Sequence, residues 1–393
     1  MLPFRGCIAL LCGFLMIEDS PDPHHAYSPV APDSAIREIL VERIERRRHA
    51  VGMGVGVIGP EGRRVIVHGK LGRDDPRPVN GDSVFEIGSV TKVFTALLLA
   101  DMAQRAEVAL TDPVAKFLPP EASVPGRAGR SITVRDLATH TSGLPRMPDN
   151  LRPTDPSNPY ADYSVEHLYG FLSGHELMRD VGEAFAYSNV GYALLGNALA
   201  RHAGGDYEAL IRSRILAPLG MNSTSIALSS DQMSRLAAGH DSQLRTVSNW
   251  DLSTFAGAGA LRSTANDLLT FLGVVLGYID STLAPAIVQM LTVRTSTGSP
   301  GLDITLGWVV RIRGHDEIVW HNGGTGGYRT FLGYLRKARV GVVVLSNTSI
   351  GVDDIGFHLL DAGIPLESGP IIVHQNGGIF RQRKRRCRSH GSD

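Results

Sequence analysis

The stretch Gly88-Ser89-Val90-Thr91-Lys92-Val93-Phe94 joins two apolar patterns around which the rest of the chain is organised. Residues 84–87 before it read as a short strand, and residues 93–102 after it have the composition of a buried helix. Ser89 is therefore expected at a helix N-terminus, with Lys92 one turn along on the same face and within reach of the serine hydroxyl. This spacing predicts a nucleophile beside its base.

Ser89 needs such a neighbour because a free serine hydroxyl is a weak nucleophile at neutral pH. A lysine accepts its proton when burial and nearby cations hold the amine neutral, and a helix N-terminus offers backbone N–H groups to a developing oxyanion. The alternative is an N-cap serine followed by an unrelated lysine. Only five of the 39 basic residues are lysines, and a lysine in an apolar helix of such a chain favours a role that requires loss of a proton, which arginine cannot provide.

Composition places the chain among ordinary soluble globular proteins. Its 393 residues are 43% hydrophobic and 20% charged, which is enough for one large domain or two lobes. A net charge of zero argues against a nucleic-acid-binding body, although residues 381–388 are basic. The cysteines, Cys7, Cys12 and Cys387, lie outside the stretch predicted to fold, so we expect neither a disulfide framework nor a cysteine zinc site there.

The N-terminus resembles a targeting segment. Residues 1–17 combine Arg5 with an apolar run over residues 7–17, whose length suits a signal-peptide core and is too short to span a bilayer. Export to the periplasm or the extracellular space is therefore expected. No small-residue cleavage site follows, so the alternatives are an uncleaved segment associated with the membrane surface and a misassigned start codon. The proline-rich residues 20–33 are interpreted as a linker.

The folded part is expected to begin with a helix over residues 35–48, capped by Asp33-Ser34. Two strand-like runs follow, residues 51–58 and 64–68, joined by a hairpin turn. The first run contains a formal G-x-G-x-x-G pattern, but a dinucleotide site requires a helix after it, and here Pro60 and a turn follow. Small residues in a strand packed close to a helix are the better interpretation.

The middle of the chain reads as mostly helical. Thr133 opens a capped helix that continues to His140, and residues 146–163 form a polar loop that is expected to border a cleft. His140 and Ser142 are weak catalytic candidates, because a helix C-terminus explains them about as well. Further helices are predicted over residues 193–202, 207–216 and 264–277.

Tyr187 and Asn189 flank a serine just before the helix predicted at residue 193. In extended or loop backbone, residues i and i+2 point the same way, so this phenol and this carboxamide can face one site together. The alternative is a buried tyrosine and an N-cap asparagine.

The last third of the chain changes to strand-like runs at residues 318–321, 330–335 and 340–346, closed by a helix over residues 355–362. Between the first two runs, the glycine-rich residues 321–327 allow a ligand to lie along the strand edge and leave backbone N–H groups exposed. A phosphate-binding loop fails as an explanation, because neither a helix start nor Gly-Lys-Ser/Thr follows.

Three motifs, taken in order, resemble the serine β-lactamase and penicillin-binding family, particularly its class C-like branch, which includes D-alanyl-D-alanine carboxypeptidases and several esterases. They are Ser89-Val90-Thr91-Lys92 for S-x-x-K, Tyr187-Ser188-Asn189 for Y-x-N and His321-Asn322-Gly323 for K/H-x-G, with support from residues 137–145 and 217–221. The resemblance covers about residues 35–363.

The resemblance implies an α+β fold of the β-lactamase/transpeptidase type. An α/β lobe with a mainly antiparallel sheet flanked by helices would span residues 34–106 and 300–365, and an inserted all-helical lobe residues 107–299. Together they form one domain, residues 34–365, followed by a basic tail that we interpret as disordered, residues 366–393. Neither a metal nor an organic cofactor is implied, and the sequence contains no H-E-x-x-H pair.

The family also implies roles for individual residues. Ser89 attacks the substrate carbonyl, while Lys92 and Tyr187 manage its proton. Asn189 holds the substrate amide and the lysine. The backbone N–H groups of Ser89 and Gly324 form the oxyanion hole, and His321 and Gly323 belong to the substrate-binding strand.

The implied activity is that of a serine hydrolase that forms an acyl-enzyme with β-lactams or with D-Ala-D-Ala-type peptides of peptidoglycan. A carboxylesterase of the same fold is the nearest alternative. A non-catalytic scaffold is less favoured, because the serine, the lysine and the tyrosine of the motifs are all present.

His321 departs from many β-lactamases, which carry lysine at this position. A lysine cation meets the substrate carboxylate, whereas histidine is largely neutral at pH 7 unless a neighbour raises its pKa. Histidine here resembles some D-Ala-D-Ala peptidases, D-amino-acid-specific peptidases and esterases of the family. Tight binding of an anionic β-lactam would then depend on a replacement such as Arg329.

Overall fold

The computed structural model describes residues 30–314 and 316–367. The signal-like segment, most of the proline-rich linker and nearly all of the basic tail lie outside the described residues. No helix within the described ranges is long and apolar enough to cross a membrane.

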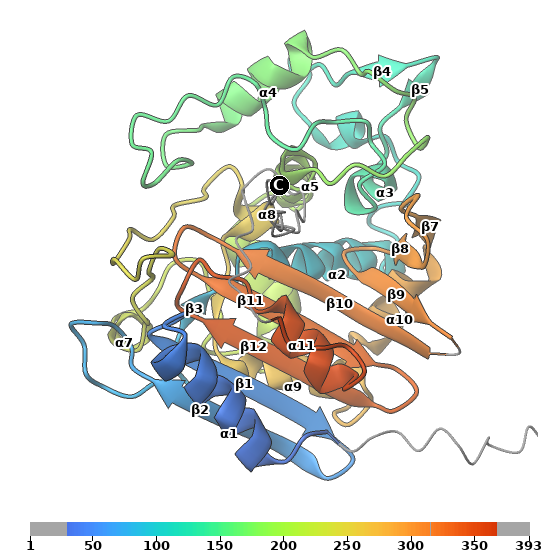
Figure 1. The fold of residues 1–393 in the computed structure, drawn as a ribbon. Helices are drawn as coiled ribbons and strands as arrows, with labels where there is room; N and C mark the ends of the chain where they lie inside the picture. Colours follow the sequence, from blue (N-terminus) through green and yellow to red (C-terminus); the bar gives the residue numbers. More distant parts are fainter. Residues whose placement is uncertain (1–29, 315, 368–393) are drawn as a thin grey trace, which may run out of the picture.

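An antiparallel sheet of eight strands forms the centre of the fold, in the order β2-β1-β12-β11-β10-β9-β8-β7 (Figure 1). The first hairpin therefore pairs with the last strand, and Val55 of β1 lies opposite Val344 of β12. The strands are β1 (Gly52–Gly59), β2 (Gly62–Gly69), β7 (Thr295–Ser296), β8 (Leu302–Ile304), β9 (Val309–Arg313), β10 (Asp316–Gly324), β11 (Arg329–Leu335) and β12 (Val340–Ser346).

Helices cover both faces of this sheet, and the alternation of side chains along β12 shows how (Figure 1). Val342 and Val344 belong to the hydrophobic cluster formed with α1 (Asp33–Val41) and α11 (Asp353–Leu360). Val343 and Leu345 point to the other face, into the larger core shared with α2 (Thr91–Gln104), α9 (Ala265–Val275) and α10 (Ala284–Thr292). The apolar helix predicted after Ser89 is thus a core helix.

The glycine pattern in β1 has the packing role that the sequence suggests. A side chain at Gly56 would meet Leu269 of α9 at 2.9 Å, so the small residue lets this helix lie close to the strand. The strand turns directly into β2 rather than into a helix. The interpretation as a hairpin in place of a dinucleotide site is therefore confirmed.

The remaining elements lie mostly between the two parts of the sheet in sequence. The helices in this part are α3 (Val134–Ala138), α4 (Val165–Gly174), α5 (Asn189–His202), α6 (Tyr207–Ile211) with the short π-helix η4 (Arg212–Leu216), α7 (Ser230–Ser234) and α8 (Ala256–Gly259). This part also contains two 3-10 turns, η2 (Gly88–Val90) and η3 (Val114–Phe117). Two short antiparallel strand pairs complete it: β3 (Phe85–Glu86) with β6 (Arg262–Ser263), and β4 (Gly126–Arg127) with β5 (Arg130–Ser131). The division into two lobes at residues 106 and 300 stays a prediction.

The first helix starts and ends earlier than predicted. Pro32 occupies the N-cap, and its carbonyl accepts the N–H groups of Ala35 and Ile36. Asp33 pairs with Arg64 at 2.6 Å instead of capping the helix. The α-helix continues as the short π-helix η1 (Glu42–Arg46) and ends before Arg48, whose φ of 54° is left-handed.

Two boundaries near the predicted motifs also move. The helix α5 begins at Asn189 because Ser188 is its N-cap, with the hydroxyl accepting the Gly191 N–H at 2.9 Å. The alternative of an N-cap asparagine is therefore wrong. The strand β10 continues to Gly324, beyond the predicted end at residue 321, because residues 322–324 pair with residues 329–331 of β11.

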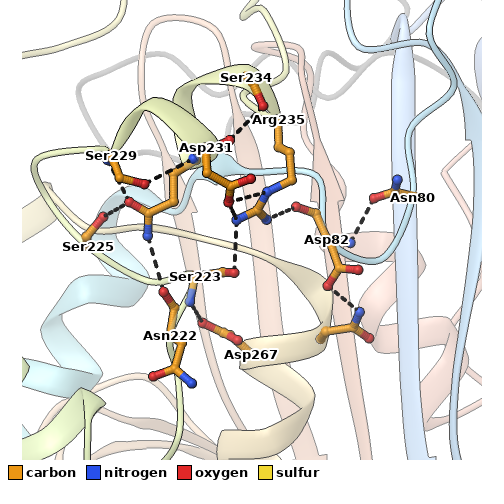
Figure 2. Close-up of polar contacts among 12 residues, drawn as sticks. Asn80, Asp82, Asn222, Ser223, Ser225, Ser229, Asp231, Ser234, Arg235 and Asp267 are labelled. Atoms are coloured by element: carbon orange, nitrogen blue, oxygen red, sulfur yellow. Dashed lines mark hydrogen bonds and ion pairs between the residues drawn. The ribbon is translucent and has the colours of Figure 1, made fainter.

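A polar network fixes the turn that leads into β3 and Ser89 (Figure 2). Arg235 Nη1 donates to the Asp82 carbonyl at 2.6 Å, and its Nη2 donates to the Asp231 carboxylate at 2.8 Å and to the Ser223 hydroxyl at 3.2 Å. The Ser223 N–H donates to Asp267 at the start of α9. This network ties the entry to the Ser89 turn to α7 and α9.

Candidate active site

Ser89 lies in the 3-10 turn η2 between β3 and α2, as the sequence predicts for a serine at a helix N-terminus. The turn depends on Gly88, whose φ of 49° is left-handed and where a Cβ atom would lie 2.6 Å from the Gly324 nitrogen. A glycine therefore lets the serine turn rest directly against the end of β10. Ser89 itself is partly exposed and lines a pocket.

Lys92 is fully buried one turn along α2. Its Nζ lies 3.0 Å from Ser89 Oγ and donates to the Ala258 carbonyl of α8 at 2.7 Å. Burial, with a smaller contribution from Arg146, holds the pKa of the Lys92 amine well below its usual range. No carboxylate in the described part of the chain forms an ion pair with Lys92, so a neutral amine with a free lone pair can take the serine proton.

Tyr187 places its ring beside this pair. The Lys92 Nζ lies 4.9 Å from the ring centroid, and the guanidinium carbon of Arg146 lies 4.9 Å from the same centroid. Burial raises the pKa of Tyr187 to about 12, against the opposing effects of the Ser89 hydroxyl and the Arg146 charge. At neutral pH Tyr187 is a phenol, able to give a proton when it receives another.

His140 supports Tyr187 rather than ending a helix. The helix α3 stops at Ala138, and His140 is a buried residue with a left-handed φ of 57°. Its ring stacks on Tyr187 at 4.4 Å, and its Nδ1 accepts the Ser188 N–H at 3.0 Å. Burial keeps the pKa of His140 well below its ordinary value, and a proton on Lys92 would lower it further. His140 is therefore neutral and positions the tyrosine, a role that the sequence analysis missed.

Asn189 follows the N-cap of α5 and lines the same pocket as Ser89. Its amide contacts the Met147 sulfur at 3.4 Å, and its backbone N–H donates to the Arg146 carbonyl at 2.9 Å. Among the described residues, the hydrogen-bond partners of the Lys92 amine are Ser89 and Ala258, so the implied contact between Asn189 and the lysine is not made.

His321 of β10 is buried near Tyr187 and is not among the residues that line the Ser89 pocket. Its Nδ1 donates to the Asn322 carbonyl at 2.6 Å, because a carbonyl can only accept, and its ring centroid is 6.3 Å from that of Tyr187. Burial, and to a smaller extent the positive charge that Lys92 carries when it is protonated, lowers the pKa of His321 to about 3. The ring is neutral at pH 7 and provides an acceptor at Nε2, not a cation.

Gly323 and Gly324 bring β10 against the serine turn. A Cβ atom on Gly323 would lie 1.9 Å from the Ile87 carbonyl oxygen and 3.2 Å from the Ser89 nitrogen. Any side chain there would separate the two backbones. The pairing of β10 with β9 ends at Trp320 opposite Val309, so β9 does not cover the edge of residues 321–324.

Arg329, considered as a substitute cation, lies next to Gly324 but is held by the protein. Its guanidinium donates to the Thr325 and Tyr328 carbonyls at 2.8 and 2.9 Å. Burial lowers the pKa of Arg329, and the nearby Asp353 opposes that shift. The Asp353 carboxylate also accepts a hydrogen bond from the Asn322 side-chain amide at 2.6 Å. Asp353 and Arg329 therefore hold the end of β10 in place.

Aromatic residues form one wall of the Ser89 pocket. The ring centroids of Tyr160 and Trp250 are 5.2 Å apart, as are those of Tyr160 and Phe255. Since Tyr160 belongs to residues 146–163, that loop borders the pocket as predicted. The backbone N–H of Trp250 donates to the Glu86 carboxylate of β3 at 3.0 Å, which fixes this wall to the serine turn.

Known proteins resemble this chain along most of its length. A family model described as Beta-lactamase matches residues 37–359. The D-alanyl-D-alanine-carboxypeptidase/endopeptidase AmpH of Escherichia coli (strain K12) is 30% identical over 362 residues, which cover 84% of this chain and 91% of the relative. A Beta-lactamase of Pseudomonas fluorescens is 25% identical over 355 residues, 79% of this chain and 93% of the relative.

Solved structures share the architecture as well. The Beta-lactamase/D-alanine carboxypeptidase from Yersinia pestis complexed with citrate is 26% identical, with a TM-score of 0.70 over 84% of this chain and 96% of that chain. A class C beta-lactamase at 21% identity has a TM-score of 0.74, covering 88% of this chain and 99% of its own. The predicted α+β fold of the β-lactamase/transpeptidase type is confirmed.

Proposed function

The chain belongs to the beta-lactamase family and is a serine hydrolase, and from this we propose that Ser89 is its nucleophile and carries the acyl group of an acyl-enzyme. The observation that carries this proposal is the 3.0 Å contact between Ser89 Oγ and the fully buried Lys92 amine. A partly exposed serine beside a desolvated amine is the arrangement that nucleophilic catalysis requires.

Acylation joins Ser89 Oγ to the substrate carbonyl carbon while the serine proton moves to the Lys92 lone pair. The leaving group needs a proton when its bond to the carbonyl carbon breaks. The Tyr187 phenol delivers that proton and receives the one held by Lys92, whose amine lies 4.9 Å from the ring centroid. Water then attacks the acyl-enzyme, loses its proton along the same route, and the proton returns to Ser89 Oγ as the product leaves.

The oxyanion of each step is assigned to the backbone N–H groups of Ser89 and Gly324. The close contact between the backbone of the serine turn and the backbone at the end of β10 supports this assignment. Gly88 and Gly323 permit this contact because neither carries a side chain that would separate the two segments. Asn189 and the neutral His321 are proposed to contact the substrate on either side of its reacting carbonyl.

We propose β-lactams and D-Ala-D-Ala-type peptides as substrates, supported by the names of the relatives above. A carboxylesterase is the second candidate. It is favoured by the neutral His321 and by the aromatic wall of Tyr160 and Trp250, both of which suit an uncharged substrate.

Hydrolysis assays test the proposal with a chromogenic cephalosporin, a D-Ala-D-Ala peptide and a nitrophenyl ester. Ser89→Ala is expected to lower turnover of the preferred substrate by at least ~10³-fold, because the acyl-enzyme route is lost. Ser173→Ala, at an exposed position on α4, is the matched control and should keep full activity. Near-normal turnover in Ser89→Ala would overturn the assignment of the nucleophile.

Export remains a further proposal, supported by the apolar run over residues 7–17. The substrates are small molecules or peptidoglycan peptides, and the N-terminal segment would provide any association with the membrane surface.

A further inference from the structure

Arg146 stands at the edge of the site, in the loop that follows α3, and its backbone is fixed. The Arg146 carbonyl accepts the Asn189 N–H at 2.9 Å, and the neighbouring Pro145 carbonyl accepts the Ser188 hydroxyl at 2.7 Å. These bonds join residues 145–146 to the N-terminus of α5, which carries Tyr187 and Asn189 beside it. The side chain of Arg146 therefore starts from a defined position next to the tyrosine.

The Arg146 charge lies close to the proposed base. Its guanidinium carbon and the Lys92 Nζ are each 4.9 Å from the Tyr187 ring centroid, so the two groups are at most about 10 Å apart. The Arg146 charge lowers the pKa of Lys92, of His140 and of Tyr187. The single positive charge of Arg146 thus lowers the pKa of all three titratable side chains around the nucleophile.

The other groups that face Lys92 carry no net charge at neutral pH. They come from every element packed around the amine: Ser89 from η2, the Ala258 carbonyl from α8, Tyr187 just before α5, Tyr192 in the first turn of α5, His140 after α3 and His321 from β10. Both histidines are kept neutral by burial. Arg146 is therefore the charged side chain that biases the protonation of this cluster.

We propose that the fixed positive charge of Arg146 adds to the effect of burial in keeping the Lys92 amine unprotonated, and that Arg146 is a positioning residue for the acylation of Ser89. The inference rests on the proposed function and adds an electrostatic cause for it. A positive charge disfavours a second positive charge nearby, and the effect is weakly screened where water is excluded. Arginine suits the task because it keeps its charge across the whole working pH range, which a histidine would not.

The pH dependence of kcat/KM for a neutral nitrophenyl ester tests this inference, because an uncharged substrate makes no ion pair with Arg146. Arg146→Gln should move the acidic limb of the profile to higher pH by about one unit and lower kcat/KM at pH 6 by about tenfold. Arg146→Lys should restore the wild-type limb, since it keeps the charge.

The matched control is Arg152→Gln, at an exposed arginine in the same loop whose guanidinium bonds to the backbone carbonyls of residues 149 and 151. It removes an equal charge that does not contribute to the lowered pKa of Lys92, and it should leave the profile unchanged.

Two failures can be distinguished. An unmoved acidic limb in Arg146→Gln, with Ser89-dependent turnover intact, would overturn the role of Arg146 and leave the nucleophile standing. Equal losses at every pH in both Arg146→Gln and Arg146→Lys would also overturn it, because shape rather than charge would then matter. Turnover that survives Ser89→Ala would instead refute the proposed function itself.

Discussion

Gly88→Ala is the substitution that most sharply tests how the serine turn is built. Gly88 has a left-handed φ of 49°, and a Cβ atom there would lie 2.6 Å from the Gly324 nitrogen and 2.8 Å from its carbonyl oxygen. Both neighbours are backbone atoms, so the end of β10 itself would have to move. The substitution therefore combines backbone strain with a steric clash.

A control variant separates the two contributions to the expected loss of stability, backbone strain and steric overlap. A left-handed alanine costs about 1–2 kcal/mol, and forcing an extra carbon into a close-packed contact adds about 1–3 kcal/mol. Gly204→Ala carries the first cost alone, because Gly204 has a φ of 74° and a Cβ atom there would meet nothing within 4 Å. The difference in free energy of unfolding between the two variants should be about 1–3 kcal/mol.

The same substitution should damage catalysis, because relief of the clash separates Gly324 from Ser89. Loss of one oxyanion donor lowers kcat by about 10²- to 10³-fold. Urea unfolding of Gly88→Ala and Gly204→Ala, followed by turnover of the best substrate, measures both effects. Equal stability of the two variants, with unchanged turnover in Gly88→Ala, would refute this account of the turn.

Two further predictions concern β10 and its support. Burial raises the pKa of Asp353 to about 6, so the folded protein binds a proton there more tightly than the unfolded chain does, and this group stabilises the fold less as pH rises from about 4 to 6. Asp353→Asn should remove that decline from the melting temperature measured over this range, and an identical slope in wild type and variant would contradict it. His321→Lys should raise acylation by a carboxylate-bearing penicillin relative to a neutral ester by about tenfold, because it introduces the missing cation. An unchanged ratio in paired acylation assays would show that residue 321 does not set this selectivity.

Local patterns were sufficient to predict the centre of the site. A serine and a lysine three residues apart on an apolar helix lie on one face, and Ser89 and Lys92 do so at 3.0 Å. The hairpin of β1 and β2 and the strands β11 and β12 follow in the same way from short strand-like runs and the turn residues between them.

The surroundings of Lys92 were not predictable in this manner, because they come from distant loops. The Ala258 carbonyl is 166 residues away along the chain, and Arg146 and Tyr160 lie in a loop without periodicity. The contact of His140 with Ser188 depends on a left-handed backbone that a non-glycine residue rarely adopts. Such contacts are set by tertiary packing, and a single sequence carries no spacing rule for them.

Mass spectrometry of the intact protein tests the central claim, that Ser89 is acylated, most directly. Wild type and Ser89→Ala would be incubated with a fluorescent penicillin and, in parallel, with an activated ester, sampled over time and mapped by proteolysis. The account predicts one acyl group on the peptide that carries Ser89, lasting if deacylation is slow and transient with released product if it is fast, and none in Ser89→Ala. An adduct on another peptide, or the same adduct in the variant, would contradict it.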